Sequence, residues 1–402
     1  MSDFFAPRLR RIKHSPSNAA SQRVRELVAA GRDVIGLTIG EPDFPTPDNV
    51  KRAAADAMAR DETRYTTVDG TETLKEAVRV KFRRENGLDY ARDEVTVACG
   101  AKQICFNAMM ATVTQGDEVL IPVPSWVSYT DMTLVADGTP RPIPCGEDHG
   151  FKLTAAQLDA AITPRTKWLV INSPGNPTGA VYSREELKAL AEVLLRHPNV
   201  WVLSDDIYEH LLFDDREYAT MAQVEPALRE RTLTVNGVSK AYAMTGWRIG
   251  FAGGPAALIR NMAKLQSQST SNPCSVSQAA AVEALLGPQE YVRSRALEMQ
   301  QRRDFVVPML NDAPGLRCTM PGGAFYAFPS CAGALGRKTP DGRTIATEQD
   351  FTLYLLDMGV AGIQGEAYGM TPYIRFSFAT DFDTLKEACR RVQAACAALK
   401  PV

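Results

Sequence analysis

Long hydrophobic runs are missing from this sequence of 402 residues. No stretch approaches the ~18 apolar residues that a membrane-spanning helix needs, and no apolar segment of signal-peptide length follows the basic N-terminal residues. An excess of positive charge is also missing, because 45 lysines and arginines stand against 47 aspartates and glutamates. The formal net charge of −2 disfavours nucleic acid and anionic membranes as partners. We therefore expect a cytoplasmic protein that acts on small molecules.

Histidine is scarce, and closely spaced cysteine pairs are absent. The four histidines lie far apart, and none stands in a pattern that marks a catalytic base. The eight cysteines include no CxxC pair, so we expect reduced structural thiols and no metal site. Cys389 and Cys396 are seven residues apart in a helical pattern, which predicts that they share one buried helix face.

The strongest positive feature is the segment VNGVSKAYAMTGWR at residues 235–248. It holds Lys240, and Arg248 follows eight residues later. A lysine amine can form a Schiff base with a carbonyl cofactor, and a guanidinium fork suits a phosphate group. The two together suggest pyridoxal phosphate. A Ser-Lys pair taken alone would more often mark a surface lysine.

From Val95 onward the chain alternates β-rich segments with amphipathic helices, which is typical of a parallel sheet with crossover helices. The turn Gly100-Ala101-Lys102-Gln103 follows a predicted strand and precedes a helix. Its backbone N–H groups therefore predict a phosphate site at the helix N-terminus. A long charged helix is expected over residues 289–310, and after it a smaller α+β region with a strand at 316–320.

Four further residues follow predicted strands of this region. Trp126 offers a flat face on which a pyridine ring can stack, although a core tryptophan is the ordinary alternative. Asn176 carries an amide that can hydrogen-bond a phenolic oxygen. Asp205 lies at the C-terminal end of a strand, where open α/β sheets place their ligands, and can keep a pyridine nitrogen protonated. Tyr208 can donate to the ring oxygen.

Two phrases carry a resemblance to a known family. Ser239-Lys240 followed by Ala243-Met244-Thr245-Gly246-Trp247-Arg248, and Ser173-Pro174-Gly175-Asn176-Pro177-Thr178-Gly179, resemble the signatures of the class I pyridoxal-phosphate-dependent aminotransferases of fold type I. The resemblance covers about residues 8–399 and is nearest to the bacterial aspartate and aspartate–prephenate subgroup.

The resemblance implies an α/β fold whose large domain has a mostly parallel, seven-stranded-type sheet flanked by helices. A smaller α+β domain would be made of both chain ends. The implied division is residues 1–47 for the N-terminal arm and part of the small domain, 48–305 for the large cofactor-binding domain, and 306–402 for the small C-terminal domain.

The resemblance also implies the site. The catalytic set is Lys240, Tyr208 and Asp205. The residues implied to bind pyridoxal 5'-phosphate are Gly100, Ala101, Lys102, Trp126, Asn176, Asp205, Tyr208, Ser239, Lys240, Arg248 and, from a neighbouring subunit, Tyr65. The residues implied to bind substrate are Gly40, Lys102, Trp126, Asn176 and Arg375, with Arg375 on the α-carboxylate. If the short stretch around Arg375 is taken alone, the alternative is a charged side chain on the solvent-exposed face of a strand.

Tyr65 and the polar segment Gln266–Thr270 imply a homodimer with shared active sites. Several positions depart from the family pattern: Gly237 stands where a serine often binds phosphate, Asp206 where glutamate is usual, and Ser17 where prephenate-using relatives have threonine. Gly362-Ile363-Gln364-Gly365-Glu366 also departs, at the expected border of the substrate pocket.

The implied activity is ping-pong transamination through a Schiff base at Lys240. The donor would be an L-amino acid, aspartate or glutamate first, and the acceptor a 2-oxo acid such as 2-oxoglutarate. An aromatic-amino-acid or prephenate aminotransferase, a carbon–sulfur lyase and a non-catalytic cofactor-binding regulator remain as alternatives. Lys102 would bind the distal carboxylate of an acidic donor.

Overall fold

The computed structural model of the chain describes residues 4–14 and 16–401, without the side chain of Ser17. The expectation that Ser17 affects the use of prephenate therefore concerns a side chain outside the described residues. Within the described part of the chain, no helix combines the length and the apolar character that crossing a membrane requires.

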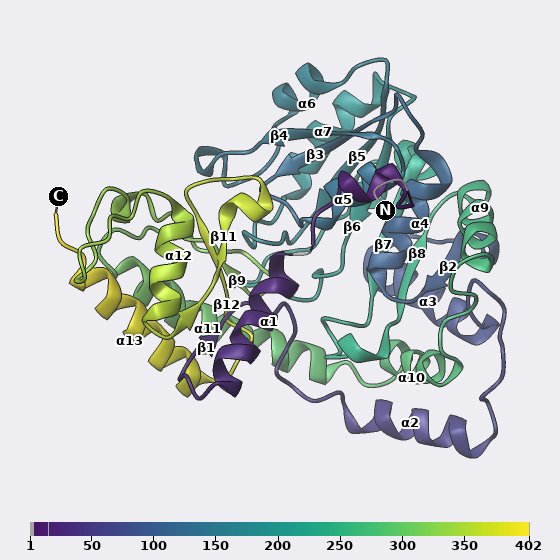
Figure 1. Cartoon of the computed structure of the whole chain (residues 1–402). Coiled ribbons are helices and arrows are strands. Elements are labelled where there is room, and N and C mark those ends of the chain that lie inside the picture. Colours follow the sequence, from purple (N-terminus) through teal and green to yellow (C-terminus); the bar gives the residue numbers. More distant parts are fainter. Residues whose placement is uncertain (1–3, 15, 402) are drawn as a thin grey trace.

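The larger part of the molecule is built on a seven-stranded sheet (Figure 1). Its strands, in spatial order, are β2 Val95–Ala98, β8 Gly250–Gly253, β7 Thr232–Gly237, β6 Trp201–Asp205, β5 Thr166–Asn172, β3 Glu118–Val123 and β4 Thr139–Pro144. β8 runs antiparallel to both of its neighbours, and the other neighbouring pairs are parallel. The predicted mostly parallel sheet is confirmed.

Helices cover both faces of this sheet, as side chains of β5 demonstrate. Trp168 and Val170 pack into one hydrophobic cluster, whereas Leu169 and Ile171 pack into another on the opposite face. Alternation of this kind, with both faces buried, is expected of a strand inside a sheet that is covered on both sides. The flanking helices are α2 Asp48–Ala59, α3 Glu72–Asn86, α4 Ala101–Thr112, α5 Ser128–Val135, α6 Ala155–Ala161, α7 Arg184–Leu195, α8 Met221–Val224, α9 Ala256–Ser267 and α10 Ser275–Leu286.

Local sequence explains where several of these helices begin and end. The Ser183 hydroxyl accepts a hydrogen bond from the Glu186 N–H, and the Glu186 carboxylate accepts one from the Ser183 N–H at 2.7 Å, which is the capping box expected from the sequence. Gly87 ends α3 with a φ of 65°, a left-handed conformation that glycine adopts without steric cost.

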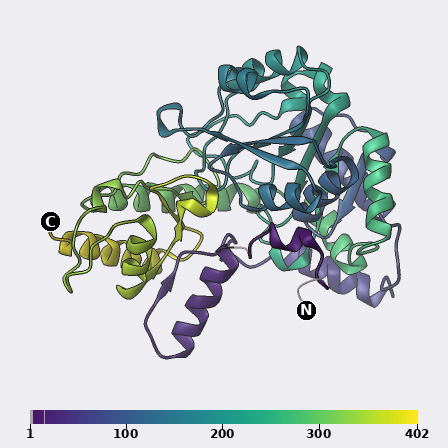
Figure 2. The same cartoon turned by 45° about the horizontal axis from the view of Figure 1, so that its top comes forward.

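The smaller part of the molecule combines both ends of the chain (Figures 1 and 2). β1 Ile35–Gly36 pairs in parallel with β10 Val360–Ala361, and a second small sheet has the order β11 Ile363–Gln364, β12 Ile374–Ser377, β9 Tyr326–Ala327. Helices α1 Pro16–Ala29, α12 Glu348–Asp357 and α13 Phe382–Ala398 surround these strands. Cys389 and Cys396 are both buried on α13, as predicted.

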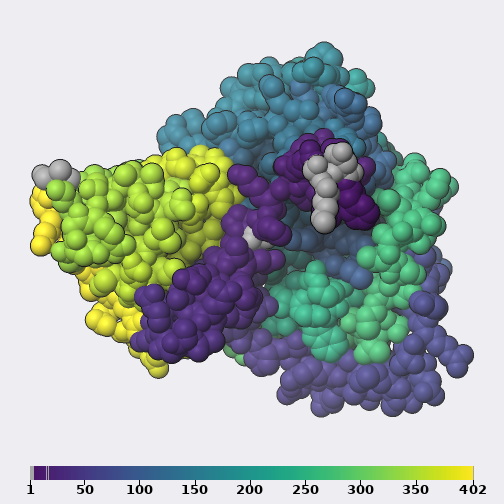
Figure 3. All heavy atoms as spheres, viewed as in Figure 1, coloured from purple at the N-terminus to yellow at the C-terminus, as the bar shows by residue number. Residues whose placement is uncertain are grey.

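Helix α11, Glu290–Asn311, connects the two parts. Val292 near its start belongs to a core cluster of the larger part, whereas Val306 and Leu310 near its end belong to the core of the smaller part. The N-terminal segment joins the parts on the surface (Figure 3): α1 lies on the yellow-green C-terminal part, and residues 4–14 lie on the blue part, where Arg11 forms an ion pair with Asp137. The boundaries predicted at residues 47 and 305 remain predictions.

One predicted element is wrong. Residues 316–320 form no strand, and only Arg317 pairs, as an isolated bridge with Ser330. Ser330 also forms an isolated bridge with Tyr373. The neighbours of Arg317 form no further bridges, so residues 316–320 do not become a strand. Pro321, which follows directly, lacks the N–H that would extend a ladder.

Candidate active site

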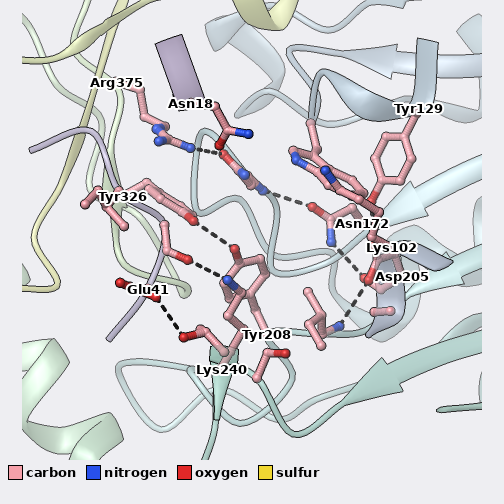
Figure 4. A pocket seen from close by; sticks show the side chains of 18 of the residues that line it. Asn18, Glu41, Lys102, Tyr129, Asn172, Asp205, Tyr208, Lys240, Tyr326 and Arg375 are labelled. Carbon is pink, nitrogen blue, oxygen red and sulfur yellow. Dashed lines mark hydrogen bonds between the residues drawn. The ribbon is translucent and has the colours of Figure 1, made fainter. Parts of the chain in front are cut away.

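A cavity of about 320 Å³ lies where the larger and smaller parts meet. Most of the residues that sequence reasoning selected line it: Gly40, Ala101, Lys102, Trp126, Asn176, Asp205, Tyr208, Ser239, Lys240, Arg248 and Arg375. Figure 4 shows side chains from both parts converging on this space. The fold thus brings together residues as far apart in the chain as Gly40 and Arg375, 335 positions.

Lys240 follows the C-terminal end of β7 and reaches into the cavity, where its amine donates a hydrogen bond to the carbonyl oxygen of Gly40. Burial of the amine lowers the pKa of Lys240 to about 8, and the positive charges of Arg375 and Arg248 act in the same direction. About a tenth of the amine is therefore neutral at pH 7, far more than for an ordinary lysine, and the neutral form is the one that attacks a carbonyl carbon.

Asp205 ends β6, and its side chain is 3% exposed. Its carboxylate accepts a 2.6 Å hydrogen bond from the hydroxyl of Tyr129, while its carbonyl oxygen accepts one of 2.8 Å from the amide of Asn172. Burial raises the pKa of Asp205, and the bond from Tyr129 opposes that rise. The result is a fixed acidic group at the C-terminal end of a central strand, where it can bind the protonated nitrogen of a ring.

Tyr208 is buried and lines the cavity beside Lys240. Its hydroxyl is 2.8 Å from that of Tyr326, and its ring centroid is 5.8 Å from the Lys240 amine. Burial raises the pKa of Tyr208 well above its ordinary value, so the phenol remains a hydrogen-bond donor at physiological pH.

The far end of the cavity is shaped for a phosphate group. A Cβ built on Gly100 would lie 2.3 Å from a guanidinium nitrogen of Arg248, and one on Gly250 would lie 2.1 Å from the amide nitrogen of Ala101. Only glycine therefore lets Arg248 approach the first turn of α4. The guanidinium is oriented by hydrogen bonds to the carbonyl oxygens of Thr245 and Cys99, at 2.9 and 3.2 Å. Helix N–H groups and a guanidinium form an anion site.

Gly237 is packed against backbone at the end of β7. A Cβ there would lie 3.0 Å from the carbonyl oxygen of Ile249, so a larger residue would require a shift of the strand end. Ser239, which is also buried, lines the cavity two residues later.

Lys102 and Trp126 form a pair on one wall. The Lys102 amine lies 4.9 Å from the centre of the Trp126 ring, and the ring in turn contacts Tyr129 edge-on at 5.2 Å. Burial lowers the pKa of Lys102, and the charge of Arg248 adds to this effect. Trp126 thus lines the cavity and also packs against the hydrophobic core.

Arg375 on β12 is 2% exposed, so the surface-charge alternative is wrong. Its guanidinium donates to the side chain of Asn176 at 2.9 Å and to the carbonyl oxygen of Thr38 at 2.6 Å, and it stacks on Tyr326 at 4.4 Å. Among the described residues no carboxylate forms an ion pair with it. A buried cation held only by neutral groups is suited to an anionic ligand.

Two further segments were expected to take part in the dimer or to border the substrate pocket. Gln266 is buried and donates hydrogen bonds to the carbonyl oxygens of Val68 and Val97, whereas residues 267–270 are exposed, and the role of this segment in a dimer stays a prediction. Ile363 pairs with Arg375 between strands and packs in a hydrophobic cluster, and neither it nor Gln364 lines the cavity. Tyr65 lies away from the cavity and is 93% exposed.

Sequence reasoning missed several lining residues: Asn18, Glu41, Tyr129, Asn172, Thr245 and Tyr326. Asn172 ends β5 beside Asp205, so the rule that ligands gather at the C-terminal strand edge would have found it. Tyr129 follows Trp126 by three residues, a spacing that puts both on one face of a helical turn. Tyr326 comes from β9 and carried no local signal.

Known proteins with similar sequences carry out the kind of chemistry that this cavity suits. Residues 32–392 match the family model described as aminotransferase class I and II. An aspartate/prephenate aminotransferase of Cereibacter sphaeroides is 56% identical over 397 residues, covering 98% of this chain and 99% of that protein.

Solved structures agree. The aspartate aminotransferase of Rhizobium meliloti has a TM-score of 0.96 and 55% identity, covering 98% of this chain and 99% of that one. A structure of the Thermus thermophilus aspartate aminotransferase with maleate has a TM-score of 0.90 and 39% identity, covering 97% and 99%.

Proposed function

The chain belongs to the class I and II aminotransferases, enzymes that depend on pyridoxal phosphate, and we propose that it transfers the amino group of L-aspartate or L-glutamate to a 2-oxo acid such as 2-oxoglutarate. The observation that carries the choice of an acidic substrate is the presence of Lys102 and Arg375 in the cavity that Arg248 also lines. Three cations match one phosphate and two carboxylates. The maleate in the Thermus structure, a four-carbon dicarboxylate, supports this choice.

The residues present fit the cofactor. The cradle that a Cβ at Gly100 would fill, together with Arg248, would hold its phosphate. Asp205 would hold the proton on the ring nitrogen, with Tyr129 and Asn172 fixing the orientation of the carboxylate segment. Asn176 and Tyr208 would donate to the ring oxygen. Bound pyridoxal phosphate supplies an aldehyde carbon and an electron-withdrawing ring.

The side chains of the chain itself then perform the proton chemistry. Lys240, with its pKa lowered to about 8, would accept the proton from the substrate α-carbon and deliver it to the carbon that the cofactor supplies as its aldehyde. Arg375 would bind the α-carboxylate by a forked contact and so fix which bond faces Lys240. Lys102 would bind the distal carboxylate.

A second candidate is transamination of prephenate, favoured by the name of the Cereibacter relative. Prephenate also carries two carboxylates, so the same three cations would serve it. We further propose a homodimer in which Tyr65, exposed in the single chain, reaches the partner's cavity. A cytoplasmic location is proposed on the eight free cysteines.

The deciding experiment is a single-turnover reaction of the cofactor-loaded enzyme with L-aspartate. The change in cofactor absorbance and the oxaloacetate released are measured together. One oxaloacetate per cofactor supports the proposal. Conversion with phenylalanine or alanine but not with aspartate would retain the aminotransferase and reject the acidic donor. If the loaded enzyme is given an S-alkyl cysteine instead, release of pyruvate, ammonia and the thiol would indicate a carbon–sulfur lyase.

A further inference from the structure

The loop between β1 and α2 is fastened to the segment that carries Lys240. The Lys240 amine donates to the carbonyl oxygen of Gly40, and the Thr245 hydroxyl donates a 2.7 Å hydrogen bond to the carboxylate of Glu41. Farther along, the Thr46 hydroxyl donates to the carbonyl oxygen of Ala243 at 2.8 Å. The loop and the lysine segment are therefore one connected unit, although about 200 residues separate them in the chain.

Glu41 places a carboxylate at the mouth of the cavity, on the side of Lys240 (Figure 4). This carboxylate accepts the hydrogen bond from Thr245, five residues after Lys240. Of the charged groups that act on the lysine amine, Glu41 has the largest effect, and it raises the pKa of Lys240. The proposed transamination assigns no catalytic or binding role to this carboxylate.

The other charges facing Lys240 come from three different elements. Arg375 on β12 and Arg248 after β7 lower the pKa of the amine, and Asp205 on β6 raises it less than Glu41 does. Under the proposed function each of these three has a partner: the substrate carboxylate for Arg375, the phosphate for Arg248 and the protonated ring nitrogen for Asp205. Once they are paired, Glu41 is left as the charge among these four that acts on Lys240 without a counterion.

We propose that Glu41 is a positioning residue whose carboxylate, held by Thr245, is the counter-charge that retains a proton on the Lys240 amine while the Gly40 loop is seated. The proposal rests on the proposed role of Lys240 as the proton carrier. A lysine that both accepts and returns a proton needs its two protonation states to lie close in free energy. Burial favours the neutral state of Lys240, and the charge of Glu41 opposes it from the loop.

The test measures the protonation of Lys240 directly in the full-length protein from which the cofactor has been removed. The protein is exposed briefly to an amine-acylating reagent from about pH 6 to about pH 10, a range around the ordinary lysine pKa. Mass spectrometry of the peptide containing Lys240 then gives the pH at which half of the amine is reactive. Glu41→Gln keeps the shape and the hydrogen bond to Thr245 but removes the charge.

Removing a negative charge destabilises the ammonium form, so we expect the midpoint of Glu41→Gln to fall by about 0.5 pH unit, or about threefold more neutral amine at a fixed lower pH. The shift is modest because Glu41 is exposed. Glu41→Asp keeps the charge and should remain near the parent value. Thr245→Val releases the carboxylate and should shift the midpoint in the same direction by less.

Asp43→Asn is the matched control, because Asp43 lies in the same loop but forms its ion pair with Arg302, away from the cavity. It should leave the midpoint unchanged. In the loaded enzyme the Lys240 amine is free only after substrate has bound, so the pH profile of kcat reports its protonation. Glu41→Gln should move the acid limb of this profile to lower pH, whereas a purely structural role of the loop would lower kcat at every pH.

Equal midpoints for the parent and Glu41→Gln, or an equal shift in Asp43→Asn, would overturn the counter-charge proposal. The labelling result does not depend on catalysis. If Lys240→Ala retained multiple turnover, the proposed function of Lys240 would fail even where the labelling midpoint shifted, so the two failures are distinguishable.

Discussion

The hydroxyl group of Tyr129 donates a 2.6 Å hydrogen bond to the carboxylate of Asp205, and both side chains are buried. Burial alone favours the protonated, neutral form of Asp205, and the bond from Tyr129 favours the ionised form. The acidity of Asp205 is therefore set by a residue on α5, 76 positions earlier in the chain.

Replacing Tyr129 with phenylalanine should raise the pKa of Asp205 and lower kcat/KM with aspartate about tenfold, the equivalent of one charge-assisted hydrogen bond. Tyr90→Phe is a matched control, since its hydroxyl is bonded to Thr234 at 3.0 Å inside the core. It should lower the free energy of unfolding without changing kcat. Unchanged kinetics in Tyr129→Phe would contradict the role of this bond.

Lys240→Ala should lose multiple turnover, because no other amine occupies its position in the cavity described. We expect a loss of at least about a thousandfold in kcat, as for removal of a group that acts in both nucleophilic and proton-transfer steps. Unfolding curves establish that the variant is folded, and equilibrium dialysis measures its cofactor content. Steady-state turnover at the parent rate would reject the assignment.

Lys102→Ala should reduce the preference for aspartate over alanine, measured as the ratio of the two kcat/KM values, by about tenfold to a hundredfold. The reason is that the distal carboxylate would lose its cation while the rest of the substrate keeps its contacts. Lys51→Ala, which removes an exposed lysine paired with Asp48, is the control. An unchanged ratio would show that Lys102 does not bind the distal carboxylate of the substrate.

Asp206→Asn should change how stability depends on pH. Burial and the charge of Glu209 raise the pKa of Asp206 to about 7, from an ordinary value of 3.8. The folded state thus holds a proton that the unfolded state has lost, and the stability this contributes is lost as pH rises through about 7.

In the variant this titration is gone, while the bond from Ser204 at 2.7 Å can still be accepted by the amide oxygen. Urea unfolding at about pH 5 and about pH 8 should show a smaller decline in unfolding free energy than in the parent, by about 1–2 kcal/mol. An identical decline would mean that Asp206 is ionised throughout.

Shared active sites can be tested by mixing two impaired variants. In a heterodimer of Lys240→Ala with Tyr65→Phe, one site combines an intact Lys240 with the intact Tyr65 of the other subunit. Refolding the two together should therefore recover activity, about a quarter of the parent value when assembly is random. Sedimentation verifies the dimer, and each variant refolded alone is the control. No recovery would place Tyr65 outside the partner's site.

The sequence by itself determined the family resemblance, the parallel sheet and much of the site, for a local reason. Lys240, Asp205 and Asn176 follow strand ends or rigid turns, and the ends of parallel strands meet at one edge of the sheet. Their proximity is therefore implied by the pattern of elements along the chain. The capping box at Ser183 and the shared face of Cys389 and Cys396 are local in the same way.

Tertiary structure alone decided the rest. Tyr326 on β9 and Glu41 reach the cavity, and Thr38 reaches Arg375, only because β1 pairs with β10 and α11 holds the smaller part against the larger. No spacing in the sequence encodes these contacts. The pKa of Lys240 depends on burial and on four charged groups, Glu41, Arg375, Arg248 and Asp205, from separate segments, so its value of about 8 is a property of the assembled fold and not of the motif that contains it.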